Sequence, residues 1–554
     1  MTAACSSKEN RSALGETLPA EASPAGKKIP RVGDLPEVER TALVVSLLEI
    51  IHLLQEENQS LKDEIARLKG QKPRPTIKPS NLERRSPNRE GQNVEERRPG
   101  SSKRGKTAEL EIHRSVIIQP ENLSEGSRFK DYQDWTVQDI VLRTYNTLYC
   151  LERWELPGGG FAVGKLPDEV AGRHFGVTLR CHILYQHYQM HVTQPLILEG
   201  LRELGVDISS GQVNRIITEG NGRLHAEKDE ILRVGLTISG HIHVDDTGAR
   251  HKGQNGYCTH IGNELFAWFQ STESKSRTNF LELLRVGSTR YVINDYALDY
   301  MRGQKLPKVQ MEQLLGCGKR MFEDEATWRA ALESLQFNAQ RHIRIATEGA
   351  MLGGIVEEGL IHPELVIVSD DAGQFAIRLH ALCWIHAERT IQKLVGFNDA
   401  QQEAVEQIRS RIWDDYGELK AYKQAPCEEK KRELETRFDE IFSTRTCYQS
   451  LNQALKRIAQ NKGELLLVLD RPEIPLHNNT SERDIREYVK KRKISGSTRS
   501  DLGRRCRDTF TSLKKTCRKL KVSFWEYLKD RVSGTHTIEP LADLMRWQAR
   551  HPCG

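Results

Sequence analysis

A run of apolar and β-branched residues at 236–244 ends on two adjacent acids, Asp245 and Asp246. Such a run predicts a β-strand with carboxylates at its far end. Two more strand-like runs follow at 256–261 and 265–269, joined by a Gly-Asn-Glu turn. We therefore expect a three-stranded meander that leaves both acids in the open at the end of its first strand.

The same pattern returns much later in the chain. The apolar run 365–369 also ends on two acids, Asp370 and Asp371. Farther on, the segment 477–486 contains Asn and Ser residues that can cap a helix whose first turn holds Glu482. We expect this glutamate to project from the start of a helix.

Two strand-end aspartates followed by a helix-borne glutamate are the layout of an RNase H-like polynucleotidyl transferase, an α/β fold with a mixed sheet flanked by helices. Magnesium prefers hard oxygen ligands and takes one or two carboxylates directly. Two such ions, about 4 Å apart, would activate the attacking oxygen and stabilise the leaving one. A solvated strand end or turn is the plainer interpretation of any single acid. The prediction therefore needs Asp245, Asp370 and Glu482 together, with Asp246 and Asp371 as neighbours or turn residues.

Four short motifs carry a resemblance to a known family. They are Asp245-Asp-Thr-Gly248, Ser369-Asp-Asp-Ala-Gly-Gln-Phe375, Cys383-Trp-Ile-His-Ala-Glu-Arg389 and His477-Asn-Asn-Thr-Ser-Glu-Arg483. Over roughly residues 40–530 the chain resembles the IS-sixty-six insertion-sequence transposases. The resemblance implies a bacterial DDE transposase that cuts and joins DNA at transposon ends. It further implies two Mg²⁺ ions, or Mn²⁺ in their place, and no covalent protein–DNA intermediate.

A rival to the second acid lies upstream. Residues 290–294 form another strand-like run, and it ends on Asp295. The helix expected before it, at 279–284, favours Asp295 as the second metal ligand. The Cys-Trp-Ile-His sequence at 383–386 follows Asp370 as in the resembled family and favours Asp370. We take Asp370 as the ligand and keep Asp295 as the alternative.

His386 and Arg389 are three residues apart and share one face of the helix that begins near 383. A helix N-terminus that points at the site favours anions. Both residues are therefore candidate phosphate contacts, with a buried, hydrogen-bonded role as the alternative for His386.

Positive charge gathers after the third acid. From Arg483 to Lys521 there are fifteen Lys or Arg residues against four acids. Clustered cations beside a carboxylate site suit a phosphodiester backbone, although a solvated basic face is the alternative. The predicted DNA contacts are Arg483, Arg486, Lys490, Lys491, Arg492, Lys493, Arg499, Arg504 and Arg505.

The N-terminal third divides by composition. Residues 1–35 lack periodicity and are expected to be disordered. Residues 36–69 carry four heptads with one Asn in the seam, which predicts a two-stranded coiled coil and a homodimer. Residues 70–107 are basic and Pro-rich, as in a flexible linker. The heptad seam consists of Val44, Leu47, Ile51, Leu54, Asn58, Leu61, Ile65 and Leu68.

Between linker and catalytic core we expect two further regions. Residues 108–156 alternate apolar and polar positions, which predicts a small β-containing module. The resembled family often has a C-x-x-C zinc element near this position, and this chain has none. Residues 157–235 look helical, and a glycine turn with a Ser-capped second helix near 205–217 fits either a helix-turn-helix that reads DNA or a plain helical hairpin. The core then spans 236–530 with a helical insertion at about 301–362, and a tail follows at 531–554.

Composition limits the remaining choices. Of 554 residues, 38% are hydrophobic and 29% charged, the net charge is +6, and no run is apolar enough to span a membrane. No apolar signal region follows Met1, so we expect a cytoplasmic, nucleoid-associated protein. Eleven cysteines without a C-x-x-C pair exclude a zinc ribbon or a disulfide framework.

Three functions compete. The leading one is the transposase, acting on double-stranded DNA with accessory proteins of the same element as candidate partners. The second is a catalytically inactive DNA-binding protein of the same ancestry. The third is a zinc hydrolase that uses His241, His243, His251 and nearby acids. The first two of these histidines alternate along a strand and can share a face, but no third ligand is spaced to match.

Overall fold

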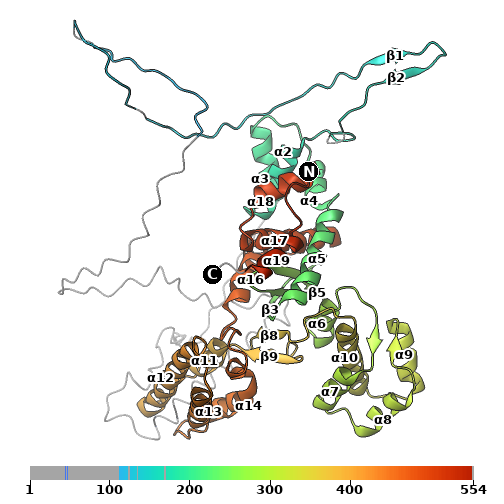
Figure 1. Ribbon diagram of the computed structural model, residues 1–554, viewed down its shortest axis with the longest axis vertical. Helices are drawn as coiled ribbons and strands as arrows, with labels where there is room; N and C mark the ends of the chain where they lie inside the picture. The colour runs from blue at the N-terminus through green and yellow to red at the C-terminus, as the bar shows by residue number, and fades with distance from the viewer. Residues whose placement is uncertain are drawn as a thin grey trace, which may run out of the picture. The chain divides into compact units, whose positions relative to one another are not determined.

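The computed structural model describes Val44, Leu47 and residues 111–122, 125–133, 135–167 and 170–551 (Figure 1). The chain divides into two units, one formed by Val38–Leu142 and one that contains Arg143–Gly554. Val44 and Leu47 are helical. The other predictions for the N-terminal segments concern residues outside the described ones: the tail 1–35, the linker 70–107 and the seam positions Ile51, Leu54, Asn58, Leu61, Ile65 and Leu68.

A five-stranded mixed sheet lies at the centre of the larger unit. Its strands are β3 (His241–Gly248), β4 (Tyr257–Gly262), β5 (Ala267–Thr272), β8 (Val366–Ser369) and β9 (Leu379–Leu382). The strand order is β5-β4-β3-β8-β9. The pairs β3–β4 and β4–β5 are antiparallel, whereas β8 runs parallel to both β3 and β9. The predicted meander is therefore confirmed, and the fold is a mixed α/β fold whose central sheet is flanked by helices.

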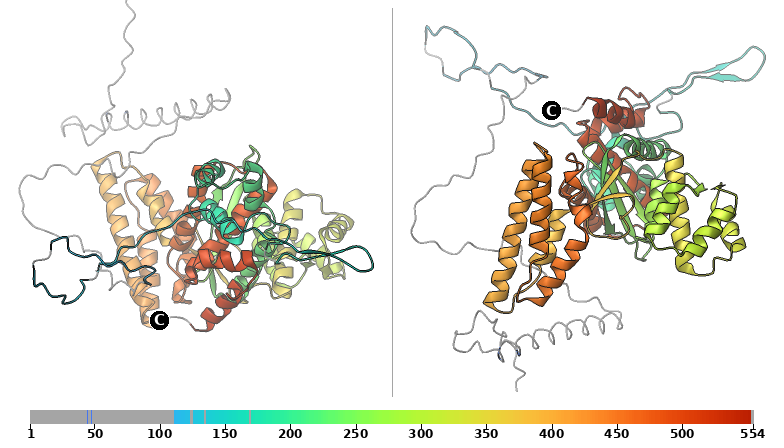
Figure 2. Two further views of the ribbon diagram at one scale, coloured as in Figure 1. Left: turned by 90° about the horizontal axis from the view of Figure 1, so that it is seen from above. Right: turned by 60° about the horizontal axis from the view of Figure 1, so that its bottom comes forward.

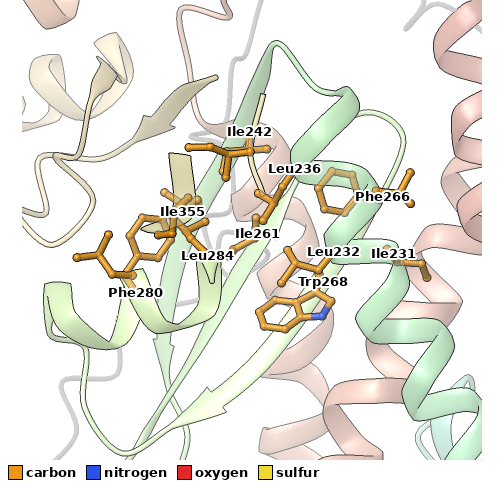
Figure 3. Close-up of a cluster of buried hydrophobic side chains, with 14 of the residues drawn as sticks. Ile231, Leu232, Leu236, Ile242, Ile261, Phe266, Trp268, Phe280, Leu284 and Ile355 are labelled. Carbon is orange, nitrogen blue, oxygen red and sulfur yellow. The ribbon is translucent and has the colours of Figure 1, made fainter. Parts of the chain in front are cut away.

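The strand prediction for 236–244 was wrong at its start. Residues up to Ile238 belong to helix α5 (Gly222–Ile238), and β3 begins only at His241. Leu232 and Leu236 recur at helical spacing and are buried in the same apolar cluster as Ile261 of the sheet (Figure 3). Burial of this helical face on the sheet outweighs the local β-propensity of the run.

Helix α17 (Asp501–Lys519) covers the open edge of the sheet at β5. Backbone N–H groups of this edge strand donate hydrogen bonds to side chains that recur every four residues along the helix. The pairs are Ser271 with Asp508 (2.8 Å), Phe269 with Ser512 (2.9 Å) and Ala267 with Thr516 (3.2 Å). The buried polar face of α17 thus satisfies a strand edge that would otherwise need another strand.

Helices α2 (Val177–Tyr188), α3 (Gln194–Glu203) and α4 (Ser210–Thr218) precede α5. Two helices joined by a turn are present, which fits both the helix-turn-helix and the plain helical hairpin: Gly205 has φ +78°, which suits the turn, and Ser209 caps α4 by accepting from the backbone of Gln212. Its expected contact with DNA stays a prediction.

The region before α2 differs from expectation. The segment 157–235 is not helical throughout, because β2 (Phe161–Val163) pairs with β1 (Arg153–Glu155) in a two-stranded hairpin. Among the described residues between 111 and 152 there is no strand, so the β-containing module predicted for 108–156 is limited to this hairpin. The segment before the hairpin has exposed apolar residues, among them Trp135 and Tyr145, and these residues form no buried core.

The segment between the first two acids is mostly helical, and its interpretation as an insertion into the core stays a prediction. Its elements, with those that lead into it, are α6 (Arg277–Leu284), β6 (Tyr291–Val292), α7 (Asp295–Gly303), α8 (Lys308–Gly316), β7 (Met321–Phe322), α9 (Glu325–Ser334) and α10 (Gln340–Glu357). The short strands β6 and β7 pair only with each other. Helix α10 approaches β6 so closely that a Cβ on Gly353 would lie within 2.1 Å of the Val292 carbonyl oxygen.

A second helical region, which the sequence reasoning missed, separates the second and third acids. It consists of α11 (Trp384–Gln392), α12 (Asp399–Tyr422), α13 (Glu428–Phe442), α14 (Gln449–Gln460), α15 (Lys462–Leu465) and the 3-10 helix η3 (Leu467–Leu469). Helices α12, α13 and α14 run side by side (Figure 2). They enclose a core of their own around Trp384 and Phe438.

The chain does not end in a loose tail at 531–554. Helix α18 (Phe524–Ser533) packs on α2, and α19 (Leu541–Arg550) packs on α5. Leu541 and Met545 of α19 are fully buried, so the folded unit extends to this last helix. No helix of the described residues is long and apolar enough to cross a membrane.

Candidate active site

Asp245 lies within β3, on the opposite face of the strand from Ile242 and Val244, which enter the apolar core. Its Oδ1 accepts a hydrogen bond from the Asp246 backbone at 2.7 Å. Contrary to expectation, the side chain is half-buried, because β3 continues past it to Gly248 and pairs it with His260. The acid therefore does not stand in the open.

Burial raises the pKa of Asp245 from 3.8 to about 7, against the lowering effect of its hydrogen bond from the Asp246 backbone. The negative charges of Asp370, Asp246 and Glu482 contribute smaller parts of the same rise.

Asp370 follows directly after β8, which runs parallel to β3. The register pairs His243 with Val368, so two residues farther along Asp245 and Asp370 stand level on neighbouring strands. Neighbouring strands lie about 4.8 Å apart, so these carboxylates lie close together toward the carboxyl-terminal ends of β3 and β8. The Asp370 Oδ1 accepts from the backbone of Ala372 at 3.2 Å.

Glu482 occupies the first turn of α16 (Asn479–Ser495), as predicted. Its Oε1 accepts a hydrogen bond from Arg389 at 3.3 Å and lies 3.6 Å from Nε2 of His386. Arg486, one turn later, approaches the other oxygen at 3.8 Å. His386 and Arg389 do share a face of α11, and that face meets Glu482.

Asn478 fixes where α16 begins, and sequence reasoning missed this role. Its side chain does not cap the helix. Instead its Oδ1 lies 2.9 Å from His243 Nδ1, and its Nδ2 donates to the Val244 carbonyl at 2.8 Å. Its backbone N–H donates to the Cys383 sulfur at 3.2 Å. One residue thus ties the start of α16 to β3 and to the start of α11.

The neighbouring acids have other partners. Asp246 accepts hydrogen bonds from Thr259 at 2.5 Å and from Gln374 at 3.0 Å. Asp371 accepts one from Asn461 at 3.4 Å. These contacts agree with their expected place beside the site.

Asp295, the alternative second acid, lies elsewhere in the fold. It is the first residue of α7 and follows β6, which belongs to the separate two-stranded sheet. Its side chain is exposed. The structure therefore aligns Asp370, and not Asp295, with Asp245 on the central sheet.

Only some of the basic residues after Glu482 are exposed at the surface. The exposed members of the predicted DNA-binding set are Arg483, Arg486, Lys490, Lys493, Arg499 and Arg505. Arg492 is half-buried and donates to the Gly248 carbonyl, and Arg504 pairs with Asp501 at 3.5 Å.

Lys491 was predicted to contact DNA but does not face solvent. Only 3% of it is exposed, and its Nζ donates to the His187 carbonyl at 2.7 Å. Lys514 and Lys515 are buried as well, and Lys519 is half-buried. Lys515 and Lys519 pair with Asp484 at 2.7 and 2.8 Å, and Lys514 pairs with Glu487 at 2.8 Å. Part of the apparent cationic excess therefore neutralises buried acids instead of facing solvent.

Comparison with known proteins identifies the chain's relatives. The family model described as "Transposase IS66 family" matches residues 172–313 and 367–505, which include all three acids, and its interruption falls largely on the helical insertion. A protein of Sinorhizobium fredii (strain NBRC 101917 / NGR234), named "Uncharacterized protein y4jO", is 43% identical over 322 residues, which are 58% of this chain and 100% of that protein. The chain belongs to the transposase IS66 family and has, by that membership, the role of a transposase, which binds DNA and cleaves and joins it.

Proposed function

We propose that this transposase is of the DDE type, with an RNase H-like core in which Asp245, Asp370 and Glu482 form the active site. The observation that carries the proposal is the placement of these acids. The parallel register of β3 and β8 sets Asp245 level with Asp370, and Asn478 ties the start of the helix that carries Glu482 to β3. The strand order β5-β4-β3-β8-β9, with β3, β8 and β9 parallel, supports the assignment of the core.

The residues fit divalent metal ions. Three carboxylates supply hard oxygen donors, and bound cations would favour the charged form of Asp245, whose pKa is raised by burial and by the neighbouring acids. Asp245 and Asp370 would hold both ions and Glu482 would complete the set. When bound, two Mg²⁺ ions, or Mn²⁺ in their place, would supply charge stabilisation at the attacking and leaving oxygens of an in-line displacement.

The reaction needs no protein nucleophile. Water attacks a DNA phosphodiester at the transposon end and releases a 3′-hydroxyl, and this hydroxyl then attacks a phosphodiester of the target DNA. The protein contributes position and charge. Asp245, within β3, is held by the Asp246 backbone, and Asp370, directly after β8, is held by the Ala372 backbone.

The exposed cations of α16 and the following turn extend from the acids and are proposed to hold the DNA backbone. Arg483 and Arg486 are exposed one turn or less from Glu482, and Lys490 and Lys493 continue along the helix. Lys and Arg contacts with phosphates are independent of sequence and weaken as salt is added. We propose further that the helix–turn–helix of α3 and α4 contacts DNA and that the heptads at 36–69 pair two subunits.

The test is cleavage of supercoiled DNA bearing the element's own ends, with and without Mg²⁺. We expect Asp245→Asn, Asp370→Asn and Glu482→Gln each to lower strand cleavage by at least about a hundredfold while DNA binding persists. Matched controls are Asp371→Asn and Asp295→Asn, which change the same charge outside the proposed triad and should retain cleavage.

Two results would overturn the proposal. One is normal cleavage by Asp370→Asn together with loss of cleavage in Asp295→Asn. The other is Mg²⁺-dependent DNA binding by the parent protein with no cleavage under any condition, which would identify a catalytically inactive DNA-binding descendant.

A further inference from the structure

Among the described residues, one group of three His, Cys, Asp or Glu side chains has ligand atoms that all lie within 4.8 Å of one another: His241, His243 and Glu264. His241 and His243 are two residues apart on β3 and so share a face of the strand. Glu264 lies in the turn between β4 and β5. Its Oε2 is 3.4 Å from Nε2 of His241, and its Oε1 is 3.9 Å from Nε2 of His243.

The two histidines turn their Nε2 atoms toward the Glu264 carboxylate, at 3.4 and 3.9 Å. Only 1% of the His243 side chain is exposed, and Nε2 of both His241 and His243 is buried without a hydrogen bond. Buried nitrogen atoms without a hydrogen bond are costly, because they have lost the water that bound them. A cation shared by the two nitrogens and the carboxylate would satisfy all three groups.

The tautomer of His243 is set by Asn478. Asn478 donates its amide Nδ2 to the Val244 carbonyl, which leaves its Oδ1 facing Nδ1 of His243 at 2.9 Å. An amide oxygen only accepts, so Nδ1 of the imidazole carries the proton and Nε2 presents a lone pair. A histidine oriented in this way by a second residue is the usual arrangement of a metal-ligating imidazole.

We propose that His241, His243 and Glu264 bind a Zn²⁺ ion. Two imidazoles and a carboxylate are ligands that zinc accepts, with water in the fourth position, whereas Mg²⁺ prefers oxygen alone. The site is chemically distinct from the three acids of the proposed active site, and it does not depend on their role. Glu264 supplies the third ligand that sequence spacing alone did not reveal.

The position of the ion implies a structural role. It would join β3 to the β4–β5 turn and hold His243 against Asn478, the residue that precedes α16. Because α16 carries Glu482, the ion would stiffen the attachment of that helix to the sheet.

Zinc binding is measured on the full chain, stripped with a chelator and dialysed against ZnCl₂. The triple variant Asp245→Asn/Asp370→Asn/Glu482→Gln serves as the background, because it removes the proposed magnesium site. We expect this background to retain one Zn²⁺ per chain. Adding Glu264→Gln should weaken zinc affinity by about tenfold or more, and adding His241→Ala should abolish stoichiometric binding. Glu264 is 61% exposed, so its variant will fold.

His251→Ala is the matched control. This histidine lies just beyond β3, but its two nitrogens bond to Thr498 and Asp501 at 2.8 and 2.9 Å, so its loss should leave zinc stoichiometry unchanged. Zinc should also raise the melting temperature of the background and not of the His241→Ala chain. Two results overturn the proposal: no zinc retained by the background while the parent chain retains it, or equal zinc affinity with and without Glu264→Gln and His241→Ala. Neither result bears on DNA cleavage by the parent chain.

Discussion

Arg389 of α11 donates a hydrogen bond of 3.3 Å to the carboxylate of Glu482, the third acid of the proposed site. His386 lies 3.6 Å from the same oxygen. The Arg389 guanidinium therefore pairs with the glutamate that would bind metal in the proposed site. We propose that Arg389 would contact phosphate when a metal ion is bound at Glu482, so its pairing with Glu482 and its predicted phosphate contact are compatible.

This competition predicts that Arg389→Ala strengthens Mn²⁺ binding in the absence of DNA. The Arg389 side chain is 41% exposed, and exposed ion pairs contribute about 0.2–1 kcal/mol. We expect an affinity gain of about two- to fivefold, measured by calorimetric titration of the DNA-free protein. Arg329→Ala, on exposed α9, is the control and should change nothing. Weaker Mn²⁺ binding by Arg389→Ala would show that the arginine positions Glu482 for metal.

The exposed start of α16 should dominate the salt dependence of DNA binding. Arg483→Ala/Arg486→Ala removes two cations beside Glu482, and each lost phosphate contact lowers the slope of log affinity against log salt by about 0.9. We expect the slope to fall by about 1–2, measured by titration at several salt concentrations. The control Arg302→Ala/Arg329→Ala removes two equally exposed cations from α7 and α9. An equal fall for both pairs would mean that only net charge matters.

The elements that carry the acids could be predicted because their signals are local. The strand-end acid Asp370 and the helix-borne Glu482 each depend on a few neighbouring residues. The start of β3 could not be placed, because the β-branched residues at 237–238 end a helix whose Leu232 and Leu236, four residues apart, pack against the sheet.

Contacts between residues far apart in the chain, and the burial that results from them, could not be predicted from the sequence either. Lys490 and Lys491 read identically as cations, yet the helix turns one outward and the other inward. Asn478 reads as a helix cap, yet it bonds to a histidine 235 positions away. Glu264 could not be joined to the two histidines until the antiparallel pairing of β3 and β4 brought its turn beside them. Tertiary contacts decide these cases, and no local pattern encodes them.

The role of Asn478 predicts a large effect on stability. Asn478→Ala leaves Nδ1 of His243 and the Val244 carbonyl buried without their partner, which we expect to lower the free energy of unfolding by about 2–4 kcal/mol. The measurement is denaturant unfolding of the metal-free protein. Asn338→Ala, at an exposed loop position, should change it by less than about 0.5 kcal/mol. If the two variants change the free energy of unfolding equally, Asn478 does not anchor the start of α16.

Lys491 predicts a pH-dependent stability of known sign. Burial, with Arg507 and Lys514 nearby, lowers the pKa of Lys491 from 10.5 to about 7. Between those values the unfolded chain holds a proton that the folded chain lacks, so the contribution of Lys491 to the free energy of unfolding rises with pH. At pH 6 both states hold the proton, and the cost of the buried charge is complete.

Lys491→Met removes that cost, so its advantage over the parent should be about 2–3 kcal/mol larger at pH 6 than at pH 9. Unfolding at the two pH values measures this difference, with the exposed neighbour Lys490→Met as the control. The control should show no such pH dependence but should weaken DNA binding, whereas Lys491→Met should leave DNA binding intact. If the two variants behave alike in both assays, the Lys491 side chain faces solvent, which would contradict its burial in this structure.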